Sequence, residues 1–363
     1  MFYYLSQFRD VFFGFNIFRY ITFRAGMAAV TTFLLCLILG PIFIKKLKQW
    51  KIQEIAKRQD CPDLDRFQES KEGTPTMGGL FIVGSIVLSV LLWADLSNRH
   101  IILTLLTCVW LAVLGFVDDY IKLTRRGQRA RGLTKKTKLL WEIFLGLLVG
   151  SYIYFNFETS TRLDVPFIKS LIIDLGIFYI PFVALVVIGT SNAVNFTDGL
   201  DGLAIGCVLI VSITLAGLSY ISGHLQFSEY LFLPFVPGAG ELTIFCAAIV
   251  GASLGFLWFN CHPATVFMGD VGSLSLGGSL GIIAVLIKKE LILALAGGIF
   301  VIEALSVILQ IASFKISKKR IFKMSPLHHH LQLSGWHESK IIVRFWILAI
   351  VLALLTLTTL KIR

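Results

Sequence analysis

The chain has 363 residues, of which 56% are hydrophobic and 15% charged, and its net charge is +11. A mean hydropathy of +0.80 excludes a set of two or three soluble domains. The positive charge suits anionic lipid head groups or a phosphorylated substrate. Nucleic acid is not expected as a partner, because no basic region is free of the apolar segments.

The first 22 residues carry six Phe and three Tyr between Arg9, Asp10 and Arg19. They lack the basic start and the small-residue cleavage site of a removable signal peptide. We therefore expect residues 1–22 to form an amphipathic segment that lies in the membrane interface. The six cysteines form no CxxC pair, and most lie in apolar segments, which indicates small core residues.

Ten apolar segments follow one another along the rest of the chain. They approach the roughly 20 residues that cross about 30 Å of hydrocarbon, and they lack the alternation of barrel strands. The sequence predicts an all-α, polytopic helical bundle of about ten transmembrane helices, with 1–363 as a single membrane-embedded domain. The expected spans are 25–44, 78–95, 101–117, 139–157, 172–190, 203–222, 242–258, 272–287, 291–314 and 343–360.

The basic residues are unevenly divided between the two sides of this bundle. Twenty-two of the 33 Lys and Arg lie in the loops after segments one, three and nine, against ten on the opposite side. Lys and Arg are enriched in cytoplasmic loops. We therefore expect the loops after the odd-numbered segments to be cytoplasmic and both termini to lie outside.

The polar residues able to do chemistry gather in those same loops. Asp118 and Asp119 end the third segment, where two carboxylates beside hydrocarbon are either a solvated pair or a site for a divalent cation or a base. Asn195 to Gly202 closes the fifth segment as either an ordinary Gly/Asp turn or a surface that presents Asp198 and Asp201 together. Asp270 stands where it would cap the eighth segment, bind a metal, or do both.

Three consecutive histidines, His328 to His330, follow the ninth segment. They cannot all face one metal from regular backbone, so contacts to phosphate or sugar hydroxyls are favoured over zinc. Glu303 lies inside the ninth segment, and Gln310 lies seven residues on, on the same helical face. An acid at that depth is either functional or a hydrogen-bonded structural group.

Five segments of the chain carry long, ordered motifs: Lys71 to Gly79, Asp118 to Tyr120, Asn195 to Gly202, Phe267 to Asp270 and His328 to His330. Together they resemble the phospho-N-acetylmuramoyl-pentapeptide transferase family. The similarity runs from about 25 to 360, and the His triplet separates this family from related polyprenyl-phosphate N-acetylhexosamine-1-phosphate transferases.

The resemblance implies transfer of phospho-MurNAc-pentapeptide from UDP-MurNAc-pentapeptide to undecaprenyl phosphate, giving lipid I and UMP, with Mg²⁺ as cofactor. It implies a multi-pass protein of the bacterial inner membrane whose active site faces the cytoplasm. The oligomeric state stays open, with a homodimer as one option. The departures from the family pattern are Gln68, Leu331-Gln332 and the segment 51–70.

The resemblance also assigns residues. Asp270 would bind the metal, and Asp118 and Asp119 would serve the metal or the lipid phosphate, one of them as a base. Lys122 and Lys138 match basic positions near the phosphates. His328 and His329 are expected to complete the pocket as catalytic residues. The residues expected to bind the substrate are Lys71, Asn195, Asp198, Leu200, Asp201, Asn260, Phe267, Gln310 and His330.

Two rival functions stay open at this stage. One is another sugar-1-phosphate transferase, using UDP-GlcNAc. The other is a transporter of a phosphorylated lipid, which would line a path through the bilayer with polar residues. The one-sided placement of the polar clusters favours an enzyme.

Overall fold

The computed structural model describes residues 1–50, 52, 71, 73–124, 132–157, 161–165 and 172–361. Within these ranges, nine helices are long and apolar enough to cross a membrane, and the 15-residue apolar helix α3 (Gly79–Trp93) lies between the first two. The prediction of a polytopic helical membrane protein is confirmed. Gln68 and several of the basic residues counted above lie outside the described residues: Lys51, Lys57, Arg58, Arg66, Arg125, Arg126, Arg129 and Arg131.

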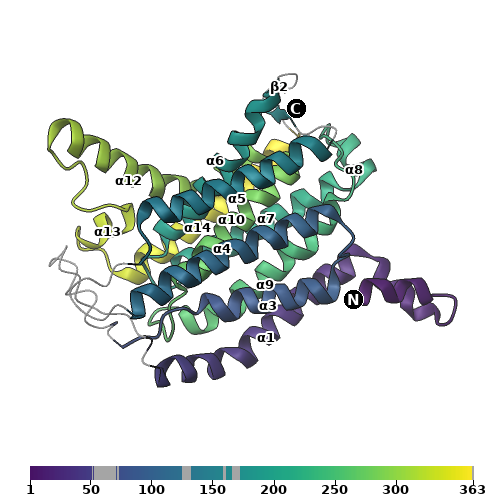
Figure 1. The fold of residues 1–363 in the computed structure, drawn as a ribbon, viewed down its shortest axis with the longest axis horizontal. Coiled ribbons are helices and arrows are strands. Elements are labelled where there is room, and N and C mark those ends of the chain that lie inside the picture. The colour runs from purple at the N-terminus through teal and green to yellow at the C-terminus, as the bar shows by residue number, and fades with distance from the viewer. Residues whose placement is uncertain are drawn as a thin grey trace.

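The long helices run side by side along the bundle (Figure 1), and the two chain ends lie at the end opposite α13 (Leu327–Gln332). The spanning helices are α1 (Ile21–Gln49), α4 (Arg99–Thr124), α5 (Lys135–Asn156), α6 (Tyr179–Thr197), α7 (Leu203–Ser222), α9 (Leu242–Asn260), α10 (Gly269–Leu286), α12 (Gly298–Ser317) and α14 (Glu338–Thr358).

Helix α10 is the centre of the bundle, and every residue from Val271 to Leu286 is buried. Its glycines allow this. A Cβ on Gly277 would lie 2.6 Å from the carbonyl oxygen of Thr190 on α6, and a Cβ on Gly278 would lie 2.0 Å from Leu111 on α4. Small residues let helix backbones approach closely in membrane proteins. The bundle therefore closes around a Gly- and Ser-rich helix that the sequence alone marks only as apolar.

The ninth apolar segment differs from its prediction. We expected one helix over 291–314, but the structure has α11 (Glu290–Ala296) and α12, separated at Gly297. Gly297 has φ −92° and ψ 24°, outside the helical region, and two adjacent glycines are poor helix formers. Helix α12 leans away from the bundle (Figure 1), which leaves apolar side chains such as Ile308 and Ile316 exposed.

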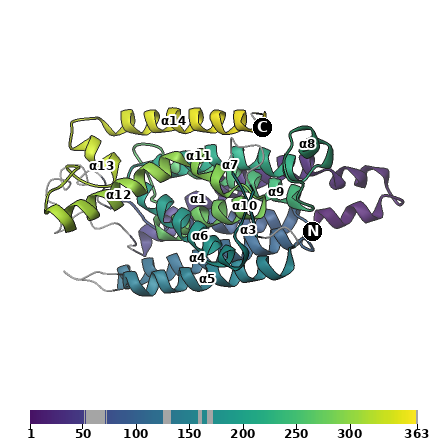
Figure 2. The ribbon, with the colours of Figure 1, turned by 90° about the horizontal axis from the view of Figure 1, so that it is seen from above.

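The N-terminal segment forms η1 (Phe2–Phe8) and η2 (Phe13–Arg19), which project from one end of the bundle (Figure 2). Neither element has a buried residue, and their predicted position in the membrane interface stays a prediction. The remaining short elements are η4 (Gly176–Phe178), α8 (Leu225–Tyr230), η5 (Ala239–Glu241), η6 (Thr359–Lys361) and an antiparallel hairpin of β1 (Arg162–Asp164) and β2 (Ile172–Asp174). The sequence analysis did not anticipate the hairpin.

A buried ion pair joins three elements at the end of the bundle near the N-terminus. The guanidinium of Arg24 on α1 donates to both carboxylate oxygens of Glu241, and its Nη1 also donates to the carbonyl of Trp93 at 3.2 Å. Glu241 accepts the backbone N–H of Asp95 at 3.1 Å. Arg24 is 1% exposed, and among the described residues Glu241 is the carboxylate that pairs with it.

We predict that Glu241→Gln lowers stability strongly, because it leaves the Arg24 guanidinium buried without a counter-ion. Removing one partner of a buried pair costs about 3–5 kcal/mol. The measurement is the melting temperature of the detergent-solubilised protein, with Glu229→Gln on the exposed side of α8 as a matched loss of charge. Equal melting temperatures for the two variants would show that the pair contributes nothing.

Candidate active site

Three carboxylates converge at the end of the bundle opposite the chain termini. Asp118 and Asp119 lie near the end of α4, and Asp270 is the second residue of α10. One oxygen from each lies within 4.8 Å of the others. Gly115 permits the meeting, because a Cβ there would lie 2.4 Å from the carbonyl oxygen of Asp270. We call Asp118, Asp119 and Asp270 the carboxylate cluster.

Two lysines neutralise most of the charge of the carboxylate cluster. The Nζ of Lys122 lies 2.6 Å from Asp118, 3.2 Å from Asp119 and 3.1 Å from Asp270. The Nζ of Lys138, on α5, lies 2.9 Å from the same Asp270 oxygen. Three negative and two positive charges leave the cluster one unit negative, which favours a further cation.

The start of α10 is capped by Asp119 and not by Asp270, which the sequence had offered as a cap. Asp270 does not cap α10, because the N-cap position is Met268 and no side chain caps the helix from there. Instead, Oδ2 of Asp119 accepts the backbone N–H of Asp270 at 2.9 Å, so the cap comes from another helix. This leaves the Asp270 carboxylate free of the helix end. Its Oδ1 accepts Asn195 Nδ2 at 2.9 Å, which fixes its orientation.

Asp118 and Asp119 do different structural work although they are neighbours. Oδ1 of Asp118 accepts the backbone N–H of Leu133 at 2.6 Å, just before α5, whereas Asp119 holds the start of α10. Both acids contact Lys122, and which of them faces a metal stays a prediction. The two residues differ in the backbone group that is bound by the carboxylate oxygen facing away from Lys122.

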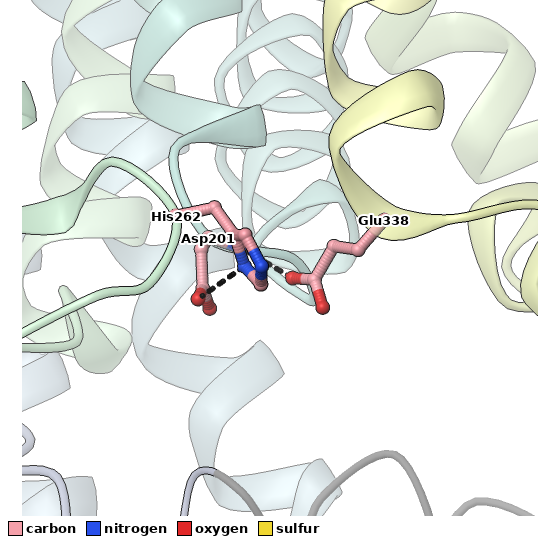
Figure 3. Close-up of side chains that lie close together, drawn as sticks. All are labelled: Asp201, His262 and Glu338. Atoms are coloured by element: carbon pink, nitrogen blue, oxygen red, sulfur yellow. Dashed lines mark hydrogen bonds and ion pairs between the residues drawn. The ribbon is translucent and has the colours of Figure 1, made fainter.

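A second polar cluster lies on the same end of the bundle and contains Lys71, Asp201, His262 and Glu338. Lys71 Nζ lies 2.7 Å from Asp201 Oδ1 and 2.6 Å from Glu338 Oε1. Figure 3 shows Asp201, His262 and Glu338 pointing toward one another, with His262 Nδ1 at 3.2 Å from Asp201 Oδ2. Burial alone would lower the pKa of Lys71, but the charges of Glu338 and Asp201 outweigh it and raise that pKa. We call these four residues the Lys71 cluster.

The two clusters are joined by a pair of aligned segments. The N–H of Phe267 donates to the carbonyl of Pro75, and the N–H groups of Gly78 and Gly79 donate to the carbonyls of Phe267 and Met268, all at 2.8 Å. The Phe267 ring lies 6.0 Å from Lys71 Nζ. Phe267 therefore stands between the Lys71 cluster and Asp270, three residues further on.

Other residues expected on the nucleotide side have structural partners here. Asn260 is buried, its Oδ1 accepts the N–H of Gly202, and its Nδ2 donates to the carbonyl of Val266, so it ties two loops together. The Leu200 side chain packs in the hydrophobic core, so only its backbone is left for a substrate. Asp198 lies half-buried in the turn beside Asn195 and Leu200.

The His triplet is divided between separate partners. His328 is fully buried, with Nδ1 at 3.2 Å from Glu303, and its ring fills the space against Gly199, where a Cβ would lie 2.3 Å from His328 Nε2. His329 Nδ1 lies 2.8 Å from Gln332 Oε1, and His330 Nδ1 accepts the N–H of Lys323. Their contacts with substrate stay a prediction.

Glu303 and Gln310 also acquire partners. Glu303 Oε1 accepts the N–H of His328, so it joins α12 to α13. The side chain of Gln310 donates to the carbonyl of Phe322 and accepts the N–H groups of Ile321 and Phe322, so it shapes the loop after α12. Both residues support the loop that carries the His triplet.

Three further residues at this end of the bundle were not among the predicted site residues. Glu142 on α5 is buried and accepts Asn192 Nδ2 at 2.8 Å, one helical turn from Lys138. An acid inside an apolar segment is a functional candidate by default, so Glu142 carried a usable signal. His262 and Glu338 carried none, because their importance depends on which loops meet in space.

Comparison with known proteins gives a consistent result. The family model of glycosyl transferase family 4 matches residues 101–288, and a signature of phospho-N-acetylmuramoyl-pentapeptide-transferase matches residues 71–83. The chain is 50% identical to the phospho-N-acetylmuramoyl-pentapeptide-transferase of Desulforapulum autotrophicum over 100% of both chains. It is 50% identical to that of Thermodesulfovibrio yellowstonii, covering 99% of both chains, and 52% identical to that of Citrifermentans bemidjiense, covering 96% of both.

Together, the family model and the signature cover every residue of the two polar clusters except Glu338. The match to the relatives covers nearly the whole chain, so it includes Glu338 as well. The similarity therefore extends over the bundle and the site together. This transferase belongs to the phospho-N-acetylmuramoyl-pentapeptide-transferase family, within glycosyl transferase family 4.

Proposed function

We propose that this chain transfers phospho-MurNAc-pentapeptide from UDP-MurNAc-pentapeptide to undecaprenyl phosphate, giving lipid I and UMP. The observation that carries the proposal is the carboxylate cluster held against Lys122 and Lys138 at one end of a membrane bundle. Phosphoryl transfer depends mainly on positioning and on neutralising phosphate charge. A lipid acceptor requires that such a site lie at the membrane surface.

The donor set of the carboxylate cluster suits Mg²⁺. That ion favours one or two carboxylates together with phosphate oxygens, and the cluster supplies carboxylate oxygens within 4.8 Å of one another. Asp270 would hold the ion, with Asn195 fixing its orientation. When bound, Mg²⁺ supplies charge neutralisation for the diphosphate and the leaving group.

The reaction is a single displacement in its simplest form. An oxygen of the lipid phosphate attacks the phosphorus next to the sugar, the phosphoanhydride bond breaks, and UMP leaves with the electron pair of that bond. Lys122 and Lys138 bind phosphate oxygens and stabilise the charge that develops on them. Asp118 accepts the proton from any acceptor phosphate that is still a monoanion.

The substrate's uridine is assigned to the Lys71 cluster and Phe267. Lys71 offers an N–H donor, and the half-buried ring of Phe267 offers a face for stacking. The distance along the chain from Phe267 to Asp270 is short enough for one nucleotide diphosphate to reach both. The two clusters would thus order the nucleoside, the diphosphate and the lipid phosphate along one end of the bundle.

The site is assigned to the cytoplasmic face of the bacterial inner membrane. The Lys and Arg bias favours this orientation. The protein's nucleotide substrate would also be available on that side. The direct test of the function is UMP release by purified protein. It must require both UDP-MurNAc-pentapeptide and undecaprenyl phosphate, and UDP-GlcNAc must not replace the first.

We predict that Asp270→Asn abolishes most turnover while the protein stays folded. The amide keeps the shape of the side chain but loses the charge that would hold Mg²⁺, so the expected loss is about 10²-fold or more. The measurement is kcat at saturating substrates across a Mg²⁺ titration, with the melting temperature as the control for folding. Near-normal kcat at ordinary Mg²⁺ would contradict the assignment.

We predict that Asp118→Asn and Asp119→Asn fail in different ways. Asp119 holds the first turn of α10, so its substitution should chiefly raise the Mg²⁺ concentration needed for half-maximal rate. Asp118→Asn should chiefly lower kcat, and more at pH 6 than at pH 8, because a phosphate monoester has a second pKa of about 6 and is mostly dianionic above it. Identical Mg²⁺ titrations and pH–rate profiles for the two variants would show that they do not divide the work.

We predict that Cys261 is reached only from the cytoplasm. It is exposed and lies in the loop between α9 and α10, whereas the other described cysteines are buried. In a Cys61→Ser background, an impermeant maleimide should label it only after intact cells are permeabilised. Glu229→Cys, on α8, is the matched control that should be labelled without permeabilisation. Ready labelling of Cys261 from outside would reverse the orientation.

A further inference from the structure

Glu338 is the first residue of α14 and reaches back into the Lys71 cluster. Its Oε1 accepts Lys71 Nζ at 2.6 Å and the backbone N–H of Asp201 at 3.0 Å. Its side chain is 11% exposed. One carboxylate oxygen therefore holds both a side chain and a main-chain group of the nucleotide side.

Asp201 completes the arrangement from the other side of Lys71. Its Oδ1 accepts Lys71 Nζ at 2.7 Å, and its Oδ2 accepts the N–H of Ala264 at 3.0 Å beside His262. Lys71, Asp201, His262 and Glu338 come from four separate segments of the chain. The cluster thus fixes the relative positions of those segments.

The same carboxylates and His262 present metal-ligand atoms within 4.8 Å of one another, but the ammonium of Lys71 already lies between the two acids. Two carboxylates, one ammonium and a histidine form an ion-pair network without a metal. The network is anchored on Asp201, which is 3% exposed. Glu338 therefore acts on Lys71 and on the turn at Asp201.

The ammonium group of Lys71 has three N–H donors. Asp201 and Glu338 take two of them, and among the described residues no bond is formed by the third. Two fixed N–H bonds stop the ammonium from rotating. The third N–H is then held in one direction, and the Phe267 ring lies 6.0 Å from the same Nζ.

We propose that Glu338 is a positioning residue for the nucleotide: it holds Lys71 and the Asp201 turn so that the third Lys71 donor meets an acceptor oxygen of the nucleoside. This inference rests on the proposed function. Glu338, at the start of α14, would thus join the residues that determine how tightly the UDP substrate binds. The lipid phosphate, at the carboxylate cluster, is not touched by Glu338.

The test is the steady-state kinetics of Glu338→Gln with both substrates varied. The neutral amide weakens a charge-assisted hydrogen bond and frees the ammonium, so KM for UDP-MurNAc-pentapeptide should rise about tenfold. The kcat and the KM for undecaprenyl phosphate should stay within about twofold of wild type. Glu229→Gln, which removes a glutamate charge at the other end of the bundle, is the control.

Two further readouts separate positioning from a general loss of structure. The charge of Glu338 helps to raise the pKa of Lys71, with Asp201 as the other acid facing it and His262 beside Asp201. In Glu338→Gln that pKa falls, so the alkaline loss of kcat/KM for the UDP substrate should begin at lower pH. In a Lys71→Met background, Glu338→Gln should add little to the rise in KM, because its target is gone.

The outcomes are distinct. If wild type releases no UMP from the two substrates, the proposed function fails and Glu338 has no such role. If wild type turns over but Glu338→Gln leaves KM unchanged, or lowers kcat alone, the inference is overturned while the function stands. If Glu338→Gln does not fold, Glu338→Asp decides the matter, because it keeps the charge on a shorter arm: a raised KM with normal kcat supports positioning, and an unchanged KM refutes it.

Discussion

The burial of three carboxylates at one end of an apolar bundle depends on the ammonium groups of Lys122 and Lys138. Like charges at this spacing repel, and each loses solvation on leaving water. The two lysines come from α4 and α5, so they can compensate the cluster only when those helices and α10 hold one register. One remaining negative charge favours a further cation, and the proposed Mg²⁺ would use it while neutralising the diphosphate of the proposed substrate. Helix packing and chemistry are therefore linked through the same few charges.

Close backbone approach makes that register possible. Gly115 lies against the Asp270 backbone, and a Cβ on Gly79 of α3 would lie 2.1 Å from the backbone nitrogen of Gly272 on α10. Any side chain at these two positions would push the start of α10 away from α4. The cap from Asp119 then acts across two helices, so the position of Asp270 depends on α4 as much as on its own helix. A central helix of small residues thus sets the active-site geometry.

The sequence predicted the helical class, the number of apolar segments and the three acids of the carboxylate cluster, because each rests on local signals. Apolar runs mark spans, and Asp118, Asp119 and Asp270 stand out beside hydrocarbon. What failed depends on three-dimensional neighbours. The helix breaks at Gly297 because two adjacent glycines lie inside an apolar run. A hydropathy average over that run does not detect them. The cap on α10 comes from another helix, and Glu338 reads as an ordinary exposed acid before α14 is folded against the turn at Asp201.

The carboxylate cluster, and not the Lys71 cluster, is the proposed cation site. Both groups contain closely spaced acidic donors, so they can be compared in one experiment. Electron paramagnetic resonance of Mn²⁺, titrated into the detergent-solubilised protein in the presence of UDP-MurNAc-pentapeptide, reports bound ion directly. The account predicts one bound Mn²⁺ per chain that is lost in Asp270→Asn and kept in His262→Ala. Binding that survives Asp270→Asn and disappears in His262→Ala would contradict it.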